Sequence, residues 1–389
     1  MDNTLDDICL TSASQQPRWD DLVQTELIRK ELSLRAPLVR ADDVRVLRDQ
    51  LARVAAGEAH VVQAGDCSED PDESTPEHVH RKAAVLDLLA GALKLITRRP
   101  VVRVGRIAGQ FGKPRTSDTE IVGGVELPVY RGHMVNSPAP DAESRRPDPL
   151  RLLTGYMAAS EIARNLGWHG VRRPHAESTV WTSHEALLLD YEVPMVREQP
   201  SGELLLTSTH FPWIGERTRQ VHGAHVTLLA KVGNPVGCKV GPAMTEDELL
   251  ALCKRLDPGR EPGRLTLIAR MGADHAAERL PPLVRAVRAA GHPVIWLTDP
   301  MHGNTVRTPS GHKTRLVTTI EREVRAFKRA VESAGGVAGG LHLETTPDHV
   351  TECARHAGDI GRVGDVYTSH CDPRLTPDQA VSVVTAWTD

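Results

Sequence analysis

Several features that would assign a protein class directly are scarce or missing in this sequence. No stretch approaches the roughly 18 uninterrupted apolar residues that indicate a transmembrane helix, so we expect no membrane span. The net charge is only −4 over 389 residues, which argues against a general affinity for nucleic acid. Aromatic residues make up only 3% of the chain, but this scarcity decides nothing about activity.

Paired cysteines and targeting signals are also missing. The six cysteines are scattered and form no CxxC pair, a pattern typical of free thiols rather than of a disulfide framework. The first residues, MDNTLDDICL, are acidic and lack the basic-then-apolar order of a secretory signal. We therefore expect a cytoplasmic protein. Internal repeats and low-complexity runs are not evident either.

Alternating strand and helix patterns fill most of the chain. Residues 1–58 are helix-prone and predict an N-terminal helical extension, and residues 59–389 predict one catalytic domain with a long loop at about 110–149. The eight expected strands lie at 60–65, 101–106, 178–185, 202–216, 237–242, 264–272, 294–298 and 339–345. This order predicts a (β/α)8 TIM barrel. A doubly wound sheet is the alternative, but no Gly-rich dinucleotide turn follows the first strand.

Polar side chains follow the most apolar of these strands. The segment PVIWLTDPMHGNT (293–305) changes abruptly from a buried strand to Asp299, His302 and Asn304. Other strand ends deliver Cys67, Glu344 and, near the C-terminus, Asp372. In parallel α/β folds chemistry is usually placed at these carboxyl ends. A thiol, an imidazole and two carboxylates there predict a metal site with mixed S, N and O ligands.

Basic residues also gather at the expected strand ends. The residues at these ends include Cys67, Arg106, Glu185, Glu216, Arg217, Lys239, Arg270, His302 and Glu344. Any one of them alone has an ordinary explanation, because most arginines are solvated and most cysteines are small core residues. Four basic side chains converging on one mouth, however, favour an anionic guest such as a phosphorylated acid.

A string of longer motifs makes a family resemblance specific. The segments are QAGDCSE (63–69), VGRIAGQFGKPRT (104–116), TSHEALLLDYE (182–192), HFPWIGERTRQ (210–220), NPVGCKVGP (234–242), ARMGAD (269–274), DPMHGNT (299–305), HLETTPDHVTEC (342–353) and CDPRL (371–375). In content and order they resemble the class II (plant-type) 3-deoxy-D-arabino-heptulosonate 7-phosphate (DAHP) synthase family. The resemblance implies condensation of phosphoenolpyruvate with erythrose 4-phosphate, the first step of the shikimate pathway or of a secondary-metabolite branch.

The resemblance also implies roles for individual residues. The implied metal ligands are Cys67, His302, Glu344 and Asp372, and the implied catalytic residues are Lys239, Arg270, His302 and Glu216. The expected substrate contacts are Arg106, Glu216, Arg217, Lys239 and Arg270 for phosphoenolpyruvate, Lys113, Arg115, Thr116 and Lys313 for the aldose phosphate, and Glu185. The ligand set suits Mn²⁺ or Co²⁺, with Zn²⁺ or Fe²⁺ also open. A homo-oligomer and a chorismate mutase partner are further expectations.

Some positions depart from the family pattern. Where RGDNVN is usual, this chain has RGHMVN, so that His133 and Met134 replace an Asp and an Asn close to the expected aldose loop. An amino sugar phosphate or another aldose phosphate could therefore replace erythrose 4-phosphate. A catalytically silent relative that acts as a binding partner is the other alternative, although the complete ligand set argues against it.

Overall fold

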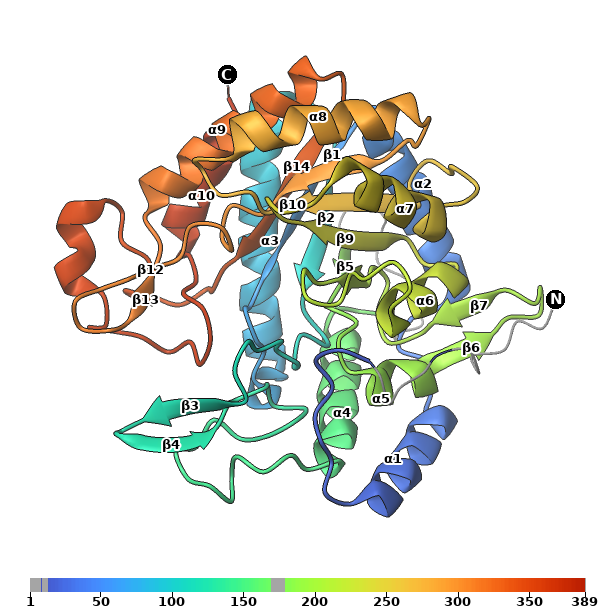
Figure 1. The fold of residues 1–389 in the computed structure, drawn as a ribbon, viewed down its shortest axis with the longest axis vertical. Helices are drawn as coiled ribbons and strands as arrows, with labels where there is room; N and C mark the ends of the chain where they lie inside the picture. Colours follow the sequence, from blue (N-terminus) through green and yellow to red (C-terminus); the bar gives the residue numbers. More distant parts are fainter. Residues whose placement is uncertain (1–7, 9–12, 169–178, 389) are drawn as a thin grey trace.

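The computed structural model describes residues 8, 13–168 and 179–388 of the chain. A single parallel sheet lies at its centre (Figure 1). Its eight strands are β1 (His60–Gly65), β2 (Val101–Arg106), β5 (Val180–Thr182), β8 (Trp213–Ile214), β9 (Val236–Val240), β10 (Leu265–Ala269), β11 (Ile295–Thr298) and β14 (Ala338–Glu344). Each one falls within or overlaps an expected strand.

Hydrogen bonds close this sheet into a barrel. The strand order runs β5-β2-β1-β14-β11-β10-β9-β8, and a parallel bridge between Glu185 and Trp213 joins the two end strands. The amide of Trp213 donates to the carbonyl of His184 at 3.1 Å, and the amide of Ala186 donates to the carbonyl of Trp213 at 3.0 Å. The predicted (β/α)8 barrel is confirmed.

Helices follow most of the strands and cover the outside of the barrel (Figure 1). They are α3 (Pro76–Thr97), α4 (Leu150–Asn165), α5 (Leu189–Glu192), α6 (Ala224–Lys231), α7 (Glu246–Leu256), α8 (Ala276–Ala289), α9 (Val317–Ser333) and α10 (Pro377–Thr385), with short 3-10 turns at Pro71–Glu73, Val193–Met195 and Ala357–Arg362. Thr245 caps the start of α7, because its side chain accepts from the amide of Glu248. A full capping box of Thr376 and Gln379 begins α10.

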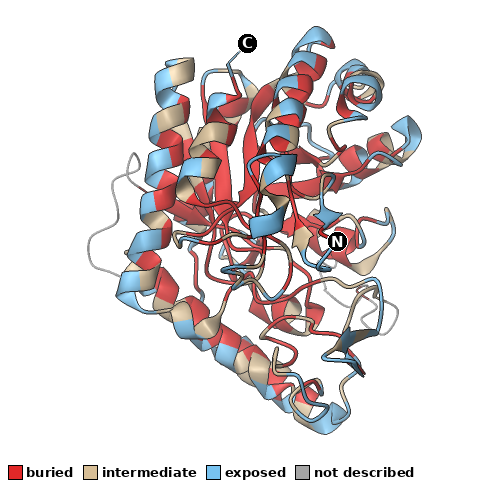
Figure 2. Cartoon of the chain, turned by 90° about the vertical axis from the view of Figure 1, so that its left-hand side faces the viewer, coloured by how far each residue is buried: buried red, intermediate tan, exposed pale blue. Residues whose placement is uncertain are grey.

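Burial separates an outer apolar layer from the barrel interior. The helices are red on their inner faces and pale blue outside (Figure 2), and their apolar side chains pack against the strands in one large cluster. A second cluster fills the interior and includes Val61, Val104, Ile268 and Leu297. No helix in the described part of the chain is long and apolar enough to cross a membrane.

The N-terminal segment contributes two helices before the first strand. These are α1 (Leu22–Leu34) and α2 (Ala41–Ala55). Three side chains of α2, Leu47, Leu51 and Val54, belong to the same apolar cluster as the barrel interior. This helix therefore packs against the barrel core rather than standing apart from it.

The single strand expected at 202–216 is wrong, because the structure forms two separate strands there. Its apolar run forms β7 (Leu204–Leu206), which pairs antiparallel with β6 (Val196–Glu198) outside the barrel, and only β8 joins the central sheet. The expected loop at 110–149 likewise contains a hairpin of β3 (Thr119–Val122) and β4 (Val125–Pro128), which projects from the lower left of Figure 1. A further hairpin of β12 (Val306–Arg307) and β13 (Lys313–Thr314) follows β11.

Candidate active site

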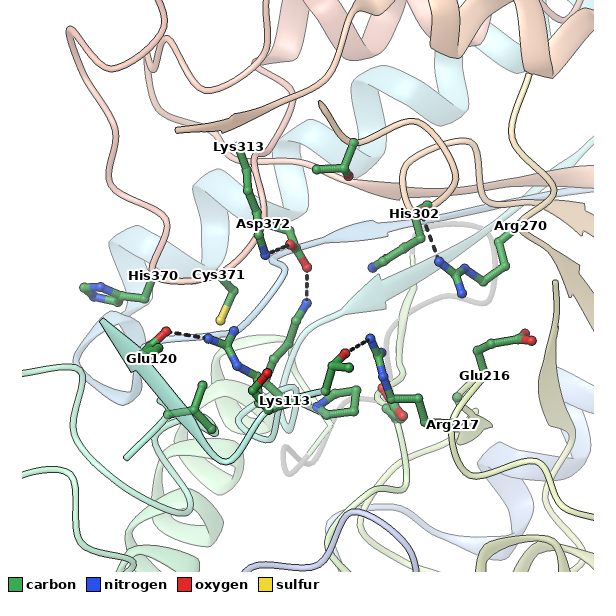
Figure 3. Close-up of a pocket in the computed structure, with 18 of the residues that line it drawn as sticks. Lys113, Glu120, Glu216, Arg217, Arg270, His302, Lys313, His370, Cys371 and Asp372 are labelled. Carbon is green, nitrogen blue, oxygen red and sulfur yellow. Dashed lines mark hydrogen bonds and ion pairs between the residues drawn. The ribbon is translucent and has the colours of Figure 1, made fainter. Parts of the chain in front are cut away.

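A cavity of about 870 Å³ opens at the C-terminal ends of the barrel strands (Figure 3). All the predicted site residues except Cys67 and Glu344 line it, namely Arg106, Lys113, Arg115, Thr116, Glu185, Glu216, Arg217, Lys239, Arg270, His302, Lys313 and Asp372. The chain thus brings together residues that lie as much as 266 positions apart along the sequence, from Arg106 to Asp372.

Beneath the cavity lie a thiol and two carboxylates. One ligand atom from each of Cys67, Glu344 and Asp372 lies within 4.8 Å of the others. The fourth predicted ligand, His302, places Nε2 3.2 Å from Glu344 Oε1. Cys67 and Glu344 are almost completely buried, whereas 23% of the His302 side chain is exposed to the cavity. The thiol and the two carboxylates therefore form one group, and the His302 imidazole lies against Glu344 on the side of the cavity.

The ammonium group of Lys113 lies inside this group. Its Nζ is 2.7 Å from Cys67 Sγ, 2.8 Å from Asp372 Oδ2 and 3.9 Å from Glu344 Oε1. Figure 3 shows the side chain pointing toward Asp372 and away from the surface of the loop. A cation therefore already fits among these donors, and the donor set of one sulfur and several carboxylate oxygens also fits a divalent metal. Lys113 was expected to contact the aldose phosphate, and its ammonium group instead pairs with these acidic groups.

Glu344 is held ionised by its neighbours. It accepts from Arg106 Nη2 at 3.1 Å and from Arg315 Nη1 at 2.7 Å. Burial alone would raise the pKa of this carboxyl group, but the charges of His302, Arg315 and Lys113 outweigh it and hold the pKa well below its ordinary value. Glu344 is therefore a permanent anion at the base of the cavity.

Asp299 links His302 to Lys239. Its Oδ2 accepts from Lys239 Nζ at 2.6 Å and lies 2.8 Å from His302 Nδ1. This contact directs Nε2 of the imidazole toward Glu344 and orients the ring as the carboxylate partners of metal-binding histidines do. Burial lowers the pKa of Lys239 to about 8, although Asp299 opposes the shift.

Two arginines offer donors to the cavity. Arg270 Nη2 donates to the carbonyl of His302 at 2.8 Å, and its Nε is buried without a hydrogen-bond partner among the described residues. Arg217 Nη2 donates to Thr116 Oγ1 at 2.9 Å, an interaction drawn in Figure 3. Buried donors without partners are costly, so the Nε of Arg270 indicates a position where a ligand oxygen would bind.

The acidic residues at the mouth differ in their environment. Burial raises the pKa of Glu185, and its Oε1 has no hydrogen-bond partner within the described structure. Glu216 Oε1 accepts from Arg219 at 2.8 Å. At the opposite side, Arg115 pairs with Glu120 at 2.7 Å and Lys313 pairs with Asp372 Oδ1 at 2.8 Å. An anion that binds there must compete with these carboxylates.

A buried ion-pair network fixes the loops that carry the thiol and the carboxylates. Asp66 pairs with Lys82 of α3 at 2.7 Å and with Arg374 at 2.8 Å, and Arg374 also pairs with Glu352 at 2.8 Å. Asp66 precedes Cys67, and Arg374 lies two positions after Asp372. Gly65 has a φ of +147°, and a Cβ there would lie 2.6 Å from the carbonyl oxygen of Arg106. Only glycine allows this close turn into the site.

Three residues of this centre were not predicted from the sequence as site residues. Asp299 orients His302, Arg315 neutralises Glu344, and His342 contacts Arg106 Nη1 at 2.6 Å and Gln63 Oε1 at 2.7 Å. Asp299 could have been predicted, because it lies three positions before His302 and directly after a strand. The pairing of Arg315 with Glu344, 29 residues away, could not have been predicted from any local pattern.

His133 and Met134, the two departures from the family pattern, lie in different surroundings. Met134 is buried and belongs to the main apolar cluster. A Cβ on Gly155 of α4 would lie 2.3 Å from its methyl carbon, so the side chain packs directly on that helix. His133 points elsewhere, toward Asp70, with its Nε2 3.8 Å from Asp70 Oδ2.

Cys67 and Cys371 pack together with Tyr130 in a small buried cluster. We expect metal-free protein left in air to form a disulfide between these cysteines, because metal binding no longer occupies the Cys67 thiol. Activity should fall and return after treatment with thiol and Mn²⁺, and peptide mass mapping should find the crosslinked pair. The same inactivation in Cys371→Ser would instead indicate oxidation of Cys67 alone, to a sulfenic acid.

A closed barrel with a polar cavity at its C-terminal strand ends is the architecture of the TIM-barrel enzymes. Within that class, this chain belongs to the class-II DAHP synthetase family, whose model matches residues 4–168 and 161–387. The described cysteines are all free and buried, as expected from their spacing.

Individual relatives agree with this assignment. A "Probable phospho-2-dehydro-3-deoxyheptonate aldolase" of Pseudomonas fluorescens is 58% identical over 392 residues, which cover 100% of this chain and 97% of the relative. A phospho-2-dehydro-3-deoxyheptonate aldolase of Streptomyces coelicolor is 39% identical over 421 residues, covering 95% and 93%. The solved structure of the Francisella tularensis enzyme of that name matches with a TM-score of 0.54 at 14% identity, over 94% of this chain and 97% of the other, and supports the fold alone.

Proposed function

We infer that this chain condenses phosphoenolpyruvate with erythrose 4-phosphate to give DAHP and inorganic phosphate, the reaction of a DAHP synthase. The observation that carries this inference is the full-length match to the class-II family. The cavity is consistent with it, because basic side chains and a thiol–imidazole–carboxylate group adjoin one space of about 870 Å³. Two phosphorylated substrates and a reacting aldehyde need such a combination.

Phosphoenolpyruvate would bind to Arg106, Arg217, Lys239 and Arg270, together with the backbone near Glu216. The support is that Arg270 Nε is buried without a partner among the described residues and that Lys239 and Arg106 line the same cavity as Arg270. These cations offset the repulsion between the phosphate and carboxylate groups of one small molecule. They also hold C3 of the enol in place for attack.

The aldose phosphate would bind on the opposite side, at Arg115, Thr116 and Lys313. Both basic residues are paired with carboxylates, Arg115 with Glu120 and Lys313 with Asp372. A phosphate dianion binds guanidinium more strongly than a single carboxylate can, through several charge-assisted hydrogen bonds. The incoming phosphate would therefore exchange for Glu120.

Cys67, His302, Glu344 and Asp372 would hold the divalent metal that the family requires. When bound, the metal supplies Lewis acidity that polarises the aldehyde oxygen. Lys113 Nζ lies 2.7 Å from Cys67 Sγ, so this ammonium group would have to move aside for a metal held by these four residues. We propose Mn²⁺ or Co²⁺ for the carboxylates, with Zn²⁺ or Fe²⁺ as the alternative for the thiolate.

The reaction forms one carbon–carbon bond and releases one phosphate. C3 of phosphoenolpyruvate attacks the aldehyde carbon, a proton must reach the new hydroxyl oxygen, water adds at C2 and phosphate leaves. We propose that Lys239 Nζ holds a proton next to the enol phosphate, that Arg270 stabilises the developing charge, and that His302 and Glu216 complete the catalytic set. Asp299 is a positioning residue, since it contacts Lys239 and His302.

Phosphate release tests this function directly. The purified chain with Mn²⁺ and phosphoenolpyruvate should release phosphate when erythrose 4-phosphate is added and remain inactive after chelation. A panel of amino and other aldose phosphates distinguishes the alternative substrates, since His133 replaces an expected Asp. No phosphate release with any member of the panel would favour the silent binding partner.

The pH dependence provides a second test. Because burial lowers the pKa of Lys239 to about 8, its positive charge is present below that pH and is lost as the pH rises. We expect kcat/KM for phosphoenolpyruvate to fall by about tenfold per pH unit above pH 8. Lys239→Arg keeps its charge, so any residual activity of that variant should not show the decline. A profile of the native chain that stays flat to pH 10 would contradict the assignment of Lys239.

Other expectations stay predictions. They are a cytoplasmic location, a homo-oligomeric state, association with a chorismate mutase, and a place in the shikimate pathway or in a secondary-metabolite branch. Size-exclusion chromatography with light scattering, alone and with a chorismate mutase, would test the two assembly states.

A further inference from the structure

Three side chains that the reaction does not use meet beside the catalytic cavity. Asp70 lies in the connection after β1, His133 in the long connection after β2, and His370 in the connection after β14. One ligand atom from each lies within 4.8 Å of the other two. Figure 3 shows His370 pointing away from Cys371 and Asp372, so this group, termed the rim cluster, is directed away from the Cys67 group.

Hydrogen bonding leaves the rim cluster incomplete. Asp70 Oδ1 accepts from the amide of Asp72 at 3.0 Å, and its Oδ2 lies 3.8 Å from His133 Nε2. That distance is too long for a hydrogen bond, and His133 Nε2 is buried without a hydrogen-bond partner in the described part of the chain. A polar nitrogen in this position calls for a further atom between it and the carboxylate.

Packing holds the two imidazole rings toward each other. Both lie edge-on to the buried ring of Tyr130, with centroids at 5.6 Å for His133 and 5.8 Å for His370, and their own centroids are 6.2 Å apart. Burial lowers the pKa of His133, which favours the neutral ring that binds metals. The rings are therefore partly ordered before any ligand arrives, which lowers the entropic cost of binding.

We propose that Asp70, His133 and His370 bind a divalent cation of the zinc class at the rim of the cavity, separate from the Cys67 group. Two imidazole nitrogens and one carboxylate oxygen suit Zn²⁺ or Co²⁺ and leave a fourth position open to water. Ligand atoms around tetrahedral zinc lie about 3.3 Å apart for bonds of about 2.0 Å. The separation of 3.8 Å between Asp70 Oδ2 and His133 Nε2 is close to this value, so small side-chain rotations suffice.

Such a cation would join three connections at the mouth. His370 is two positions before Asp372, so a rim cation restrains the segment that delivers Asp372 to the Cys67 group. It would act as a clamp between that segment and the connections after β1 and β2. This effect does not depend on the identity of the substrates.

Metal counting on the full chain tests the proposal. The protein is stripped with a chelator, equilibrated with excess Zn²⁺, freed of unbound metal and analysed by mass spectrometry. Cys67→Ser removes the thiolate of the other group, so the ion that this variant keeps should be lost when His133→Ala and His370→Ala are added. His356→Ala is the matched control. His356 and Asp359 form an exposed pair 3.4 Å apart outside the rim cluster, and no third ligand among the described residues joins them. This variant should leave the number of bound metal ions unchanged.

Cobalt gives an independent readout. With Co²⁺, Cys67→Ser should lose the sulfur-to-metal charge-transfer absorption and keep the visible bands of a site with nitrogen and oxygen ligands. Those bands should disappear when His370→Ala is added to Cys67→Ser. Because His370 is exposed, this added change tests the rim site even if the variants of His133 fail to fold. If Cys67→Ser binds no ion, or if removing His370 leaves both the count and the bands unchanged, the rim site does not exist.

Discussion

Glu344→Ala should abolish turnover and metal binding and also destabilise the protein by roughly 3–5 kcal/mol, as expected when one member of a buried charge cluster is removed. Glu344 is completely buried and neutralises both Arg106 and Arg315, which are themselves buried. Its place at the end of an expected strand predicts a carboxylate at the mouth of the barrel. The structure buries this carboxylate completely, so its loss would leave the guanidinium groups of Arg106 and Arg315 without this carboxylate partner.

Chemical denaturation and metal analysis of the same sample separate the two effects. Glu192 offers a matched control, because it is a buried carboxylate that contacts His184 and Ser208 away from the cavity. Glu192→Ala should lose stability but keep its metal. If Glu344→Ala unfolds at the same denaturant concentration as the native chain, the buried cluster around it is wrong. If it retains its metal, Glu344 is not a ligand.

His302→Ala should also abolish measurable turnover, but with little loss of stability. Its side chain faces the cavity with 23% exposure and contacts Asp299 and Glu344, each of which keeps another cationic partner. The folded barrel should therefore remain, with a change in unfolding free energy within about 1 kcal/mol. Steady-state kinetics and metal content are the measurements.

Asp299→Asn is the companion variant for His302. It keeps the shape of the side chain and removes the charge that orients His302 Nδ1, so metal affinity should fall by about 10–100-fold while some turnover survives. Retained activity in His302→Ala, with metal content near that of the native chain, would remove this imidazole from the metal group.

The fold could be predicted from local patterns because most barrel strands are buried on both faces. Strand β11 is a continuous apolar run that ends in Thr298, and β10 is apolar apart from Thr266 and is followed by Arg270. This pattern can be recognised without knowledge of the neighbouring strands. The run Leu204–Leu206 has the same composition, but it pairs with Val196–Glu198 in a hairpin. Composition indicates that a segment is extended and does not choose its partner.

The site was predictable to the extent that its residues end strands. Arg106, Lys239, Arg270 and His302 line one cavity because parallel strands place their carboxyl ends at one edge. The location of Lys113 among the acidic groups and the pairing of Arg315 with Glu344 depend on loops, whose paths the strand pattern does not specify. The packing of Met134 on Gly155 of α4 likewise depends on the path of the loop that carries Met134, which no sequence pattern specifies.

The barrel is expected to be least stable locally where β5 and β8 meet. These strands have three and two residues, against five to seven in β1, β2, β9, β10 and β14. Local opening begins where backbone hydrogen bonds are fewest, so amide protons along this seam should exchange with solvent before those of β1 or β14. Glu185 bridges the seam to Trp213, and both residues line the cavity. A ligand that fills the cavity and contacts these two residues should therefore stabilise the barrel at the β5–β8 junction, where local opening begins.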